Sequence, residues 1–162
     1  MKYSQKKEGR KSFGDNSTDD RVERAVATFV DGHRCSQAIL ETFAVDYGLS
    51  KDLALKIGCP FGGGMARTGE TCGAVTGALM VIGLKYGRVD VDDSRALEKT
   101  DDRVKEFFRR FKSRNRSLVC RELIGCEIGT PEGMDFANQN NVFGNICRNL
   151  VRDAAEILRD IL

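Results

Sequence analysis

The sequence predicts an all-α protein: a single-domain bundle of about six to seven helices around a buried, glycine-containing central helix. Apolar residues recur at helical spacing in every clearly periodic segment, and no segment of useful length alternates apolar and polar residues as a strand does. Residues 72–84 contain no charged side chain, so we expect them to form the buried central helix. The predicted domain covers residues 18–162, which is long enough to bury a core without disulfides.

Helix-start and helix-stop residues delimit the expected elements in order along the chain. The expected helical segments are 18–31, 35–47, 51–57, 72–86, 94–114, 118–124, 131–137 and 142–162. Ser117 is predicted to cap the short sixth segment, which places Cys120 at its third position. The last segment is predicted as one continuous helix with Cys147 inside it. Residues 1–17 are polar and lysine-rich, and we expect them to form a disordered basic tail.

Composition and charge exclude several classes of protein. The net charge is +2, so the overall balance favours neither nucleic acid nor an anionic membrane as a partner. No run reaches the roughly 18 apolar residues that a membrane-spanning helix needs. The lysine-rich N-terminus lacks the apolar block of a secretory signal. We therefore expect a cytoplasmic protein that does not enter a membrane.

Cysteine is the residue type that points to chemistry. The chain has six cysteines, at positions 35, 59, 72, 120, 126 and 147, and a single histidine. In a reducing cytosol such a number favours metal binding or redox chemistry over structural disulfides. No two cysteines form a CxxC pair, which argues against a zinc ribbon, a thioredoxin-type site and covalent haem attachment. Any shared site must therefore be assembled in space from separate helices. Cys35, Cys72 and Cys120 each fall in a first helical turn, where the helix dipole favours a thiolate.

Two neighbouring stretches resemble a known family. The sequence GGMAR at residues 63–67 precedes TCGAVTGA at residues 71–78. Together they look like the signature of a redox-active family with four scattered cysteines and a CGAxxG motif, the C-GCAxxG-C-C type. The similarity extends over most of the chain, from about residue 34 to residue 158. On this resemblance the four family cysteines are Cys35, Cys72, Cys120 and Cys147.

The leading hypothesis is a redox protein whose four family cysteines bind an iron–sulfur cluster used in electron transfer. Four thiolates are what such clusters use, and a domain related to this family occurs in a bacterial cytochrome that also holds an iron–sulfur centre, which supports a cluster by analogy. Gly73 and Gly77 would leave room for the cluster. The turn formed by Gly62, Gly63 and Gly64 would offer backbone amides to its sulfides.

Three alternatives stay open. The first is metal-free thiol–disulfide or peroxide-type chemistry, with a pair such as Cys59 and Cys72. The second is a structural zinc site of four cysteines. The third is that individual cysteines are small core residues, which applies most to Cys147. Cys59 and Cys126 are either such residues or a second redox pair.

The predicted fifth helix has a basic outer face that includes Arg109 and Arg110. Such a face is usually solvated, but a redox partner protein with an acidic surface could dock there. Nucleic acid is not expected, because no aromatic residues interleave with the basic ones, and a homodimer stays open. We expect His33 to be a surface residue, and Arg67 and Glu70 to form a local ion pair or helix cap.

Overall fold

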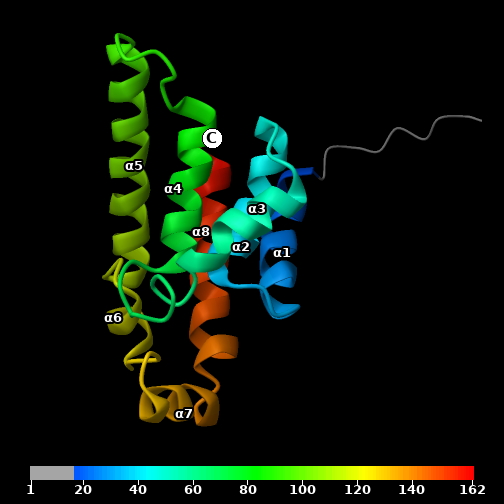
Figure 1. The fold of residues 1–162 in the computed structure, drawn as a ribbon, viewed down its shortest axis with the longest axis vertical. Coiled ribbons are helices and arrows are strands. Elements are labelled where there is room, and N and C mark those ends of the chain that lie inside the picture. The colour runs from blue at the N-terminus through cyan, green and yellow to red at the C-terminus, as the bar shows by residue number, and fades with distance from the viewer. Residues whose placement is uncertain (1–16) are drawn as a thin grey trace, which may run out of the picture.

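The computed structural model describes residues 17–162, whose ribbon is shown in Figure 1. Within this range the chain forms eight α-helices and no β-strand, which confirms the all-α prediction. Each of the eight expected segments corresponds to one of these helices, so the bundle has slightly more than the predicted six to seven. They are α1 (Ser17–Val30), α2 (Cys35–Ala44), α3 (Lys51–Gly58), α4 (Gly73–Tyr86), α5 (Ser94–Asn115), α6 (Cys120–Ile124), α7 (Pro131–Gln139) and α8 (Arg148–Ile161). The predicted basic tail, residues 1–17, lies outside the described residues except for Ser17, which begins α1.

The central helix α4 packs closely against α2 because α4 carries two glycines on the facing side. A Cβ atom at Gly77 would lie 2.9 Å from the carbonyl oxygen of Ser36 and 3.0 Å from Cβ of Ile39. A Cβ atom at Gly73 would lie 3.1 Å from the Ser36 nitrogen and 3.2 Å from Cβ of Cys35. The glycines therefore allow the two backbones to approach. This contact holds the first turn of α2 against the first turn of α4.

Helix α8 completes the bundle by packing against α1, α2, α4 and α5. Its buried residues are Leu150, Val151, Ala154, Ala155, Ile157, Leu158 and Ile161. On its polar side, Arg114 of α5 pairs with Asp153 at 3.0 Å and with Glu156 at 2.6 Å. Figure 1 shows α6 and α7 at the lower end of the bundle, opposite the C-terminus. The start of α8 lies at that lower end, next to α6 and α7.

The burial of α4 is less complete than the sequence predicts. The helix is buried from Gly73 to Ala78, but Leu84 in its last turn is 42% exposed. This turn lies at the end of the bundle beside the C-terminal residue, where the Tyr86 hydroxyl donates to the carbonyl oxygen of Leu162 at 3.2 Å. Across residues 17–162, no helix has both the length and the apolar character that crossing a membrane requires.

One predicted helix cap is wrong, and one predicted helix is less regular than expected. Ser117 does not cap α6: the preceding residue is Val119, whose N–H donates to Ser117 Oγ at 3.0 Å. The chain before α6 is extended because it pairs with the loop before α4, through an antiparallel bridge between Thr71 and Val119. The predicted last helix is helical over residues 142–161, but residues 143–147 form a π-helical turn within it that ends at Cys147. Such turns are frequent at functional sites.

Alanine substitutions at Gly77 and Gly83 test the close packing of α4 on α2. Both glycines lie inside α4, but a Cβ atom at Gly83 meets nothing within 4 Å. There, alanine should stabilise the protein by about 1 kcal/mol through helix propensity. At Gly77 the added methyl group meets backbone atoms, and overpacking costs about 1–3 kcal/mol. Urea unfolding should therefore give Gly77→Ala a free energy of unfolding about 1–3 kcal/mol lower than that of Gly83→Ala. Equal stabilities would contradict the close approach.

Candidate functional site

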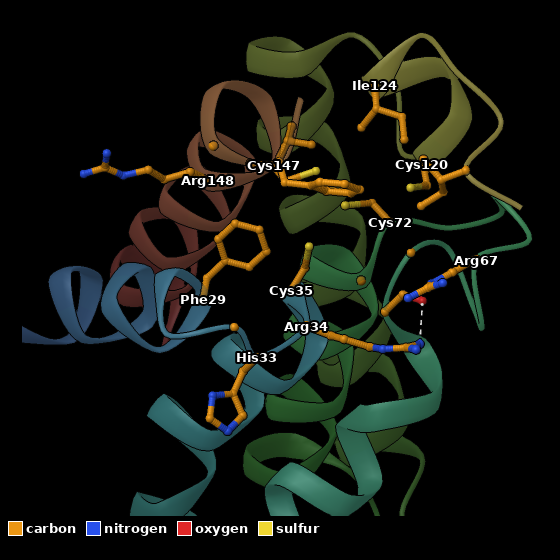
Figure 2. Close-up of a pocket in the computed structure, with 18 of the residues that line it drawn as sticks. Phe29, His33, Arg34, Cys35, Arg67, Cys72, Cys120, Ile124, Cys147 and Arg148 are labelled. Carbon is orange, nitrogen blue, oxygen red and sulfur yellow. Dashed lines mark hydrogen bonds between the residues drawn. The ribbon is translucent and has the colours of Figure 1, made fainter. Parts of the chain in front are cut away.

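A cavity of about 720 Å³ lies among α2, the loop before α4, α6 and the start of α8. All four cysteines that the family resemblance singled out line this cavity: Cys35, Cys72, Cys120 and Cys147. Figure 2 shows their sulfur atoms pointing into the same space from four different elements. The fold therefore brings together thiols that are far apart in the sequence.

Each of the four thiols is attached to the end of a regular element. Cys35 is the first residue of α2, and Cys120 is the first residue of α6. Cys72 immediately precedes α4, and Cys147 ends the π-turn before α8. Backbone hydrogen bonds hold such positions more firmly than the tips of long loops. The four side chains are thus presented by a fixed framework.

Two antiparallel backbone hydrogen bonds hold Cys72 beside Cys120. The N–H of Cys72 donates to the carbonyl oxygen of Leu118 at 2.8 Å. The N–H of Cys120 donates to the carbonyl oxygen of Glu70 at 2.6 Å. These bonds tie the loop before α4 to the start of α6, so the two thiols belong to one small substructure.

The loop before α4 contains a left-handed turn. All five residues 63–67 have φ between 50° and 71°, and three of them are not glycine. Each of these three costs about 1–2 kcal/mol in this conformation. Backbone hydrogen bonds offset part of the cost, among them Ala66 N–H to the carbonyl oxygen of Pro60 at 2.8 Å. A Cβ atom at Gly64 would lie 2.7 Å from Cβ of Cys120, so this glycine lets the turn reach the α6 thiol.

Arg121 of α6 holds this loop from its outer side. Its guanidinium pairs with the carboxylate of Glu70 and lies 3.6 Å from that of Glu127. It also donates to the carbonyl oxygen of Thr68 at 3.1 Å. Glu70 therefore pairs with Arg121 and not, as the sequence analysis expected, with Arg67. The reason is that α6 packs directly on the loop, which a local reading of the sequence does not show.

Burial and mutual repulsion raise the pKa values of three of the thiols. Desolvation raises the pKa of Cys72 to about 11, although the backbone amides of Ala74 and Val75 act to lower it. Desolvation and the neighbouring sulfurs raise the pKa of Cys120 to about 12. A hydrogen bond between the thiols of Cys35 and Cys147, together with burial, raises the pKa of Cys35 well above its usual value. The same bond lowers the pKa of Cys147.

These shifts correct one expectation. We expected the helix starts to favour thiolates at Cys35, Cys72 and Cys120, but the thiols by themselves are held in the protonated form. Burial in a low dielectric disfavours the charged form, and here it outweighs the helix amides. Only a bound cation would reverse this balance, since a coordinated thiol loses its proton.

The two remaining cysteines have different surroundings. Cys126 is half-buried and packs in the apolar cluster that contains Cys120 and Cys147. Burial and the nearby Cys147 raise its pKa. Cys59 is exposed at the start of a 3₁₀ turn (Cys59–Phe61) and does not line the cavity. The structure therefore places Cys126 near the four thiols and leaves Cys59 outside.

The glycines expected to surround a cofactor divide into two groups. Gly62, Gly63 and Gly73 line the cavity. Gly64 and Gly77 do not, because Gly64 faces Cys120 and Gly77 faces the backbone of α2. Gly77 thus serves helix packing and does not leave room for a bound group.

The basic residues of the cavity wall were not predicted from the sequence. Arg34, Arg67, Arg148 and His33 line the cavity, whereas no Asp or Glu among residues 17–162 does so. Figure 2 shows the His33 ring directed away from the four sulfurs. The only signals in the sequence are the adjacency of Arg34 to Cys35 and the place of Arg67 at the end of the GGMAR stretch. Neither signal indicates which surface the side chain reaches.

A comparison with known families places the chain in one of them. A family model described as "Putative redox-active protein (C_GCAxxG_C_C)" matches residues 33–161. The chain belongs to this family. In this member of the four-cysteine family the central motif reads CGAVTG, at residues 72–77. No curated protein and no solved structure matches the chain significantly. The family description states redox activity and names no cofactor.

The basic face of α5 in this four-cysteine family member is not adjacent to the thiol cavity. Arg109 and Arg110 pair with Glu106 at 2.8 and 2.6 Å, and Arg110 lies 3.8 Å from Asp160 near the end of α8. The cavity reaches only the first turn of α8, at Arg148 and Leu150. The helix between Leu150 and Asp160 rises by about 15 Å. A redox partner on Arg109 and Arg110 would therefore bind at a distance from the sulfurs.

Thiol labelling tests the burial pattern. In the reduced protein, iodoacetamide should label Cys59 first, since it is exposed. Cys72 and Cys120 are 2% and 5% exposed, and we expect them to react last. A thiol with a pKa of about 11 is ionised in about one molecule per thousand at pH 8. Peptide mapping over time measures the rates, with urea-unfolded protein as the control. Equal rates for Cys59 and Cys72 in the folded protein would contradict the structure.

The raised thiol pKa values also predict a loss of stability at alkaline pH. In the unfolded chain Cys72 and Cys120 ionise near 9.0, but in the folded chain they ionise at about 11 and 12. Below about pH 8 both states are protonated and stability is at its full value. Between about pH 9 and 11 the folded state retains protons that the unfolded state has lost. The free energy of unfolding should then fall by about 1.4 kcal/mol per pH unit for each thiol.

Urea unfolding of the reduced, metal-free protein at several pH values measures this slope. In the variant Cys72→Ala, the free energy of unfolding should fall less steeply with pH, by about 1.4 kcal/mol per pH unit, because one titrating thiol is absent. This holds whether or not the variant is less stable overall. A slope that Cys72→Ala leaves unchanged would show that this thiol is not the group that titrates.

Proposed function

We propose that the protein transfers electrons through an iron–sulfur cluster held by Cys35, Cys72, Cys120 and Cys147. The observation that carries the proposal is that four thiols from four elements line one cavity, three of them buried and one half-buried. Four cysteine thiolates are the usual ligands of such clusters. In the described part of the chain no carboxylate lines the same wall, so sulfur dominates the donor set. Sulfur donors fit iron–sulfur clusters and other soft metal centres.

The zinc alternative has no preformed tetrahedral site in the described part of the chain. Around one tetrahedral zinc ion, with Zn–S near 2.3 Å, the sulfurs would lie about 3.8 Å apart. Among residues 17–162, no three side chains of His, Cys, Asp or Glu lie close enough to share one metal ion. A cluster carries its thiolates on separate irons and so accepts sulfurs that are further apart. The described residues therefore offer no preformed site for a single zinc ion.

The surroundings of the thiols suit a bound redox centre. A cluster supplies one-electron transfer when it is bound. Ionisation of Cys120 is opposed by Cys72 and Cys147, and a metal centre would relieve that repulsion. Phe29 and Phe143 line the cavity and would exclude water from the centre. The arginines of the wall would offset the negative charge of thiolates and sulfides.

A metal-free dithiol is the second candidate, and the contact between Cys35 and Cys147 favours it. The hydrogen bond from Cys35 lowers the pKa of Cys147, which makes Cys147 the better nucleophile. Its thiolate would attack a small organic disulfide and release one thiol. Cys35 would then displace the second thiol and close a Cys35–Cys147 disulfide. Two electrons and two protons pass from the protein thiols to the substrate.

Metal analysis of protein purified without oxygen tests the cluster. We expect bound iron and acid-labile sulfide together with visible colour. The variants Cys72→Ser and Cys120→Ser should lose iron and colour. Cys59→Ser is the matched control and should keep both, because Cys59 is exposed outside the cavity.

Colourless protein without iron would overturn the cluster proposal. In that case peptide mapping after treatment with a small disulfide decides the second candidate, which requires a Cys35–Cys147 bridge. Recovery of both cysteines as free thiols would reject it as well.

A further inference from the structure

The cavity wall carries two arginines that have no carboxylate partner. Arg34 and Arg67 both line the thiol cavity, and neither forms an ion pair within the part of the chain that the structure describes. Glu70, a carboxylate of the same loop as Arg67, is already paired with Arg121. Two guanidinium groups on one wall repel each other. An anion bound between them would replace that repulsion with attraction.

The glycine turn holds these two arginines in place. A Cβ atom at Gly62 would overlap the side chain of Arg34, and one at Gly63 would lie 3.2 Å from Cγ of Arg67. Both side chains therefore lie flat against the turn. Nη1 of Arg34 and the backbone N–H of Arg67 each donate to the carbonyl oxygen of Gly62 at 3.4 Å. Figure 2 shows the two guanidinium groups on the same side of the cavity.

The backbone of Arg67 is strained. Its φ of 71° lies in the left-handed region, where a residue with a side chain costs about 1–2 kcal/mol relative to the right-handed form. Glycine at this position would avoid that cost. Such strain is typically found at binding sites and active sites. The observation therefore supports a binding role for the Arg67 side chain.

The remainder of the cavity suits a small organic molecule. Its volume of about 720 Å³ falls within the usual range for small-molecule sites. Its apolar lining consists of Phe29, Val30, Ile124, Ile128, Met134, Phe143 and Leu150. A mainly apolar wall with two planar guanidinium groups fits a ligand that has an apolar body and a carboxylate or phosphate group.

We propose that this cavity binds a small organic anion, with Arg34 and Arg67 holding its carboxylate or phosphate group and the apolar wall holding its body. The anion would lie beside the four thiols, where a redox centre can reach it. Arg148 is not part of this site, because Figure 2 shows it pointing away from the sulfurs and it interacts with the charge of Glu23. The inference goes beyond the proposed function, since it requires the arginines and the cavity but no particular redox centre.

Fluorine NMR titration of the full chain, purified without oxygen, tests the inference. The probes are 4-fluorobenzoate, 4-fluorophenyl phosphate and the neutral 4-fluorobenzamide. Both anions should bind at least about tenfold more tightly than the amide, because hydrogen bonds to charged groups are worth that much. Arg34→Gln and Arg67→Gln should each weaken binding of the anions by about tenfold and leave the amide unchanged.

Arg95→Gln is the matched control, since Arg95 is exposed on α5 outside the cavity. Equal binding of the anions and the amide, or an unchanged affinity in the double variant of Arg34 and Arg67, would overturn the inference. If a variant fails to fold, the unmodified protein provides a second measurement. There 4-fluorobenzoate should slow iodoacetamide labelling of Cys35 and not of Cys59, and equal labelling with and without the anion would also overturn the inference.

Iron content measured on the same samples separates the two proposals. If the protein binds the anions but contains no iron, only the cluster proposal is rejected. If the protein contains iron but binds the anions no better than the amide, only the anion-site proposal is rejected. The arginines would then serve as counter-charges to the cluster.

Discussion

Two backbone hydrogen bonds, from Cys72 N–H to Leu118 and from Cys120 N–H to Glu70, hold the functional end of this protein together. Helix α6 has only five residues, and an isolated helix of that length is not stable in water. Its position therefore depends on these bonds and on the contacts of Arg121 with the same loop. The thiol of Cys120 faces the cavity only while this short ladder is intact.

The second constraint is steric and acts between α2 and α4. Gly73 and Gly77 allow the backbone of α2 to lie against α4, which brings Cys35 close to Cys72. Glycine costs about 1 kcal/mol in a helix interior, and the close contact explains why two glycines are tolerated there. Gly83 has no comparable contact, and we find no structural reason for it. The same helix thus contains glycines that shape the site and one that does not.

Competing electrostatic effects determine the state of the thiols. A helix N-terminus typically stabilises a negative charge by about 0.3–1 kcal/mol. The rise in the pKa of Cys72 from 9.0 to about 11 corresponds to about 2.7 kcal/mol in the opposite direction. Burial therefore prevails at Cys72, whose thiol stays neutral until a bound cation changes the balance. Arginines on the wall, with no carboxylate among the lining residues of the described chain, favour negative charge in the same cavity.

Local patterns in the sequence determined the helices, because caps and apolar periodicity act over a few residues. The Ser50 hydroxyl accepts from Leu53 N–H, and the Thr130 hydroxyl accepts from Gly133 N–H, as their positions before the helices predict. The sequence also identified the cysteine set, through a motif that the family match supports. The local pattern wrongly predicted Ser117 as the cap of α6, because pairing with a distant loop keeps the backbone there extended.

Only the tertiary structure decided how these elements form a site. It showed that the four thiols share one cavity, that Glu70 pairs with Arg121, and that Arg34 and Arg67 lie on the cavity wall. It also showed that burial keeps the thiols of Cys72 and Cys120 protonated. Each of these facts depends on contacts between segments far apart in the chain, and a local sequence pattern carries no information about the distance between such segments.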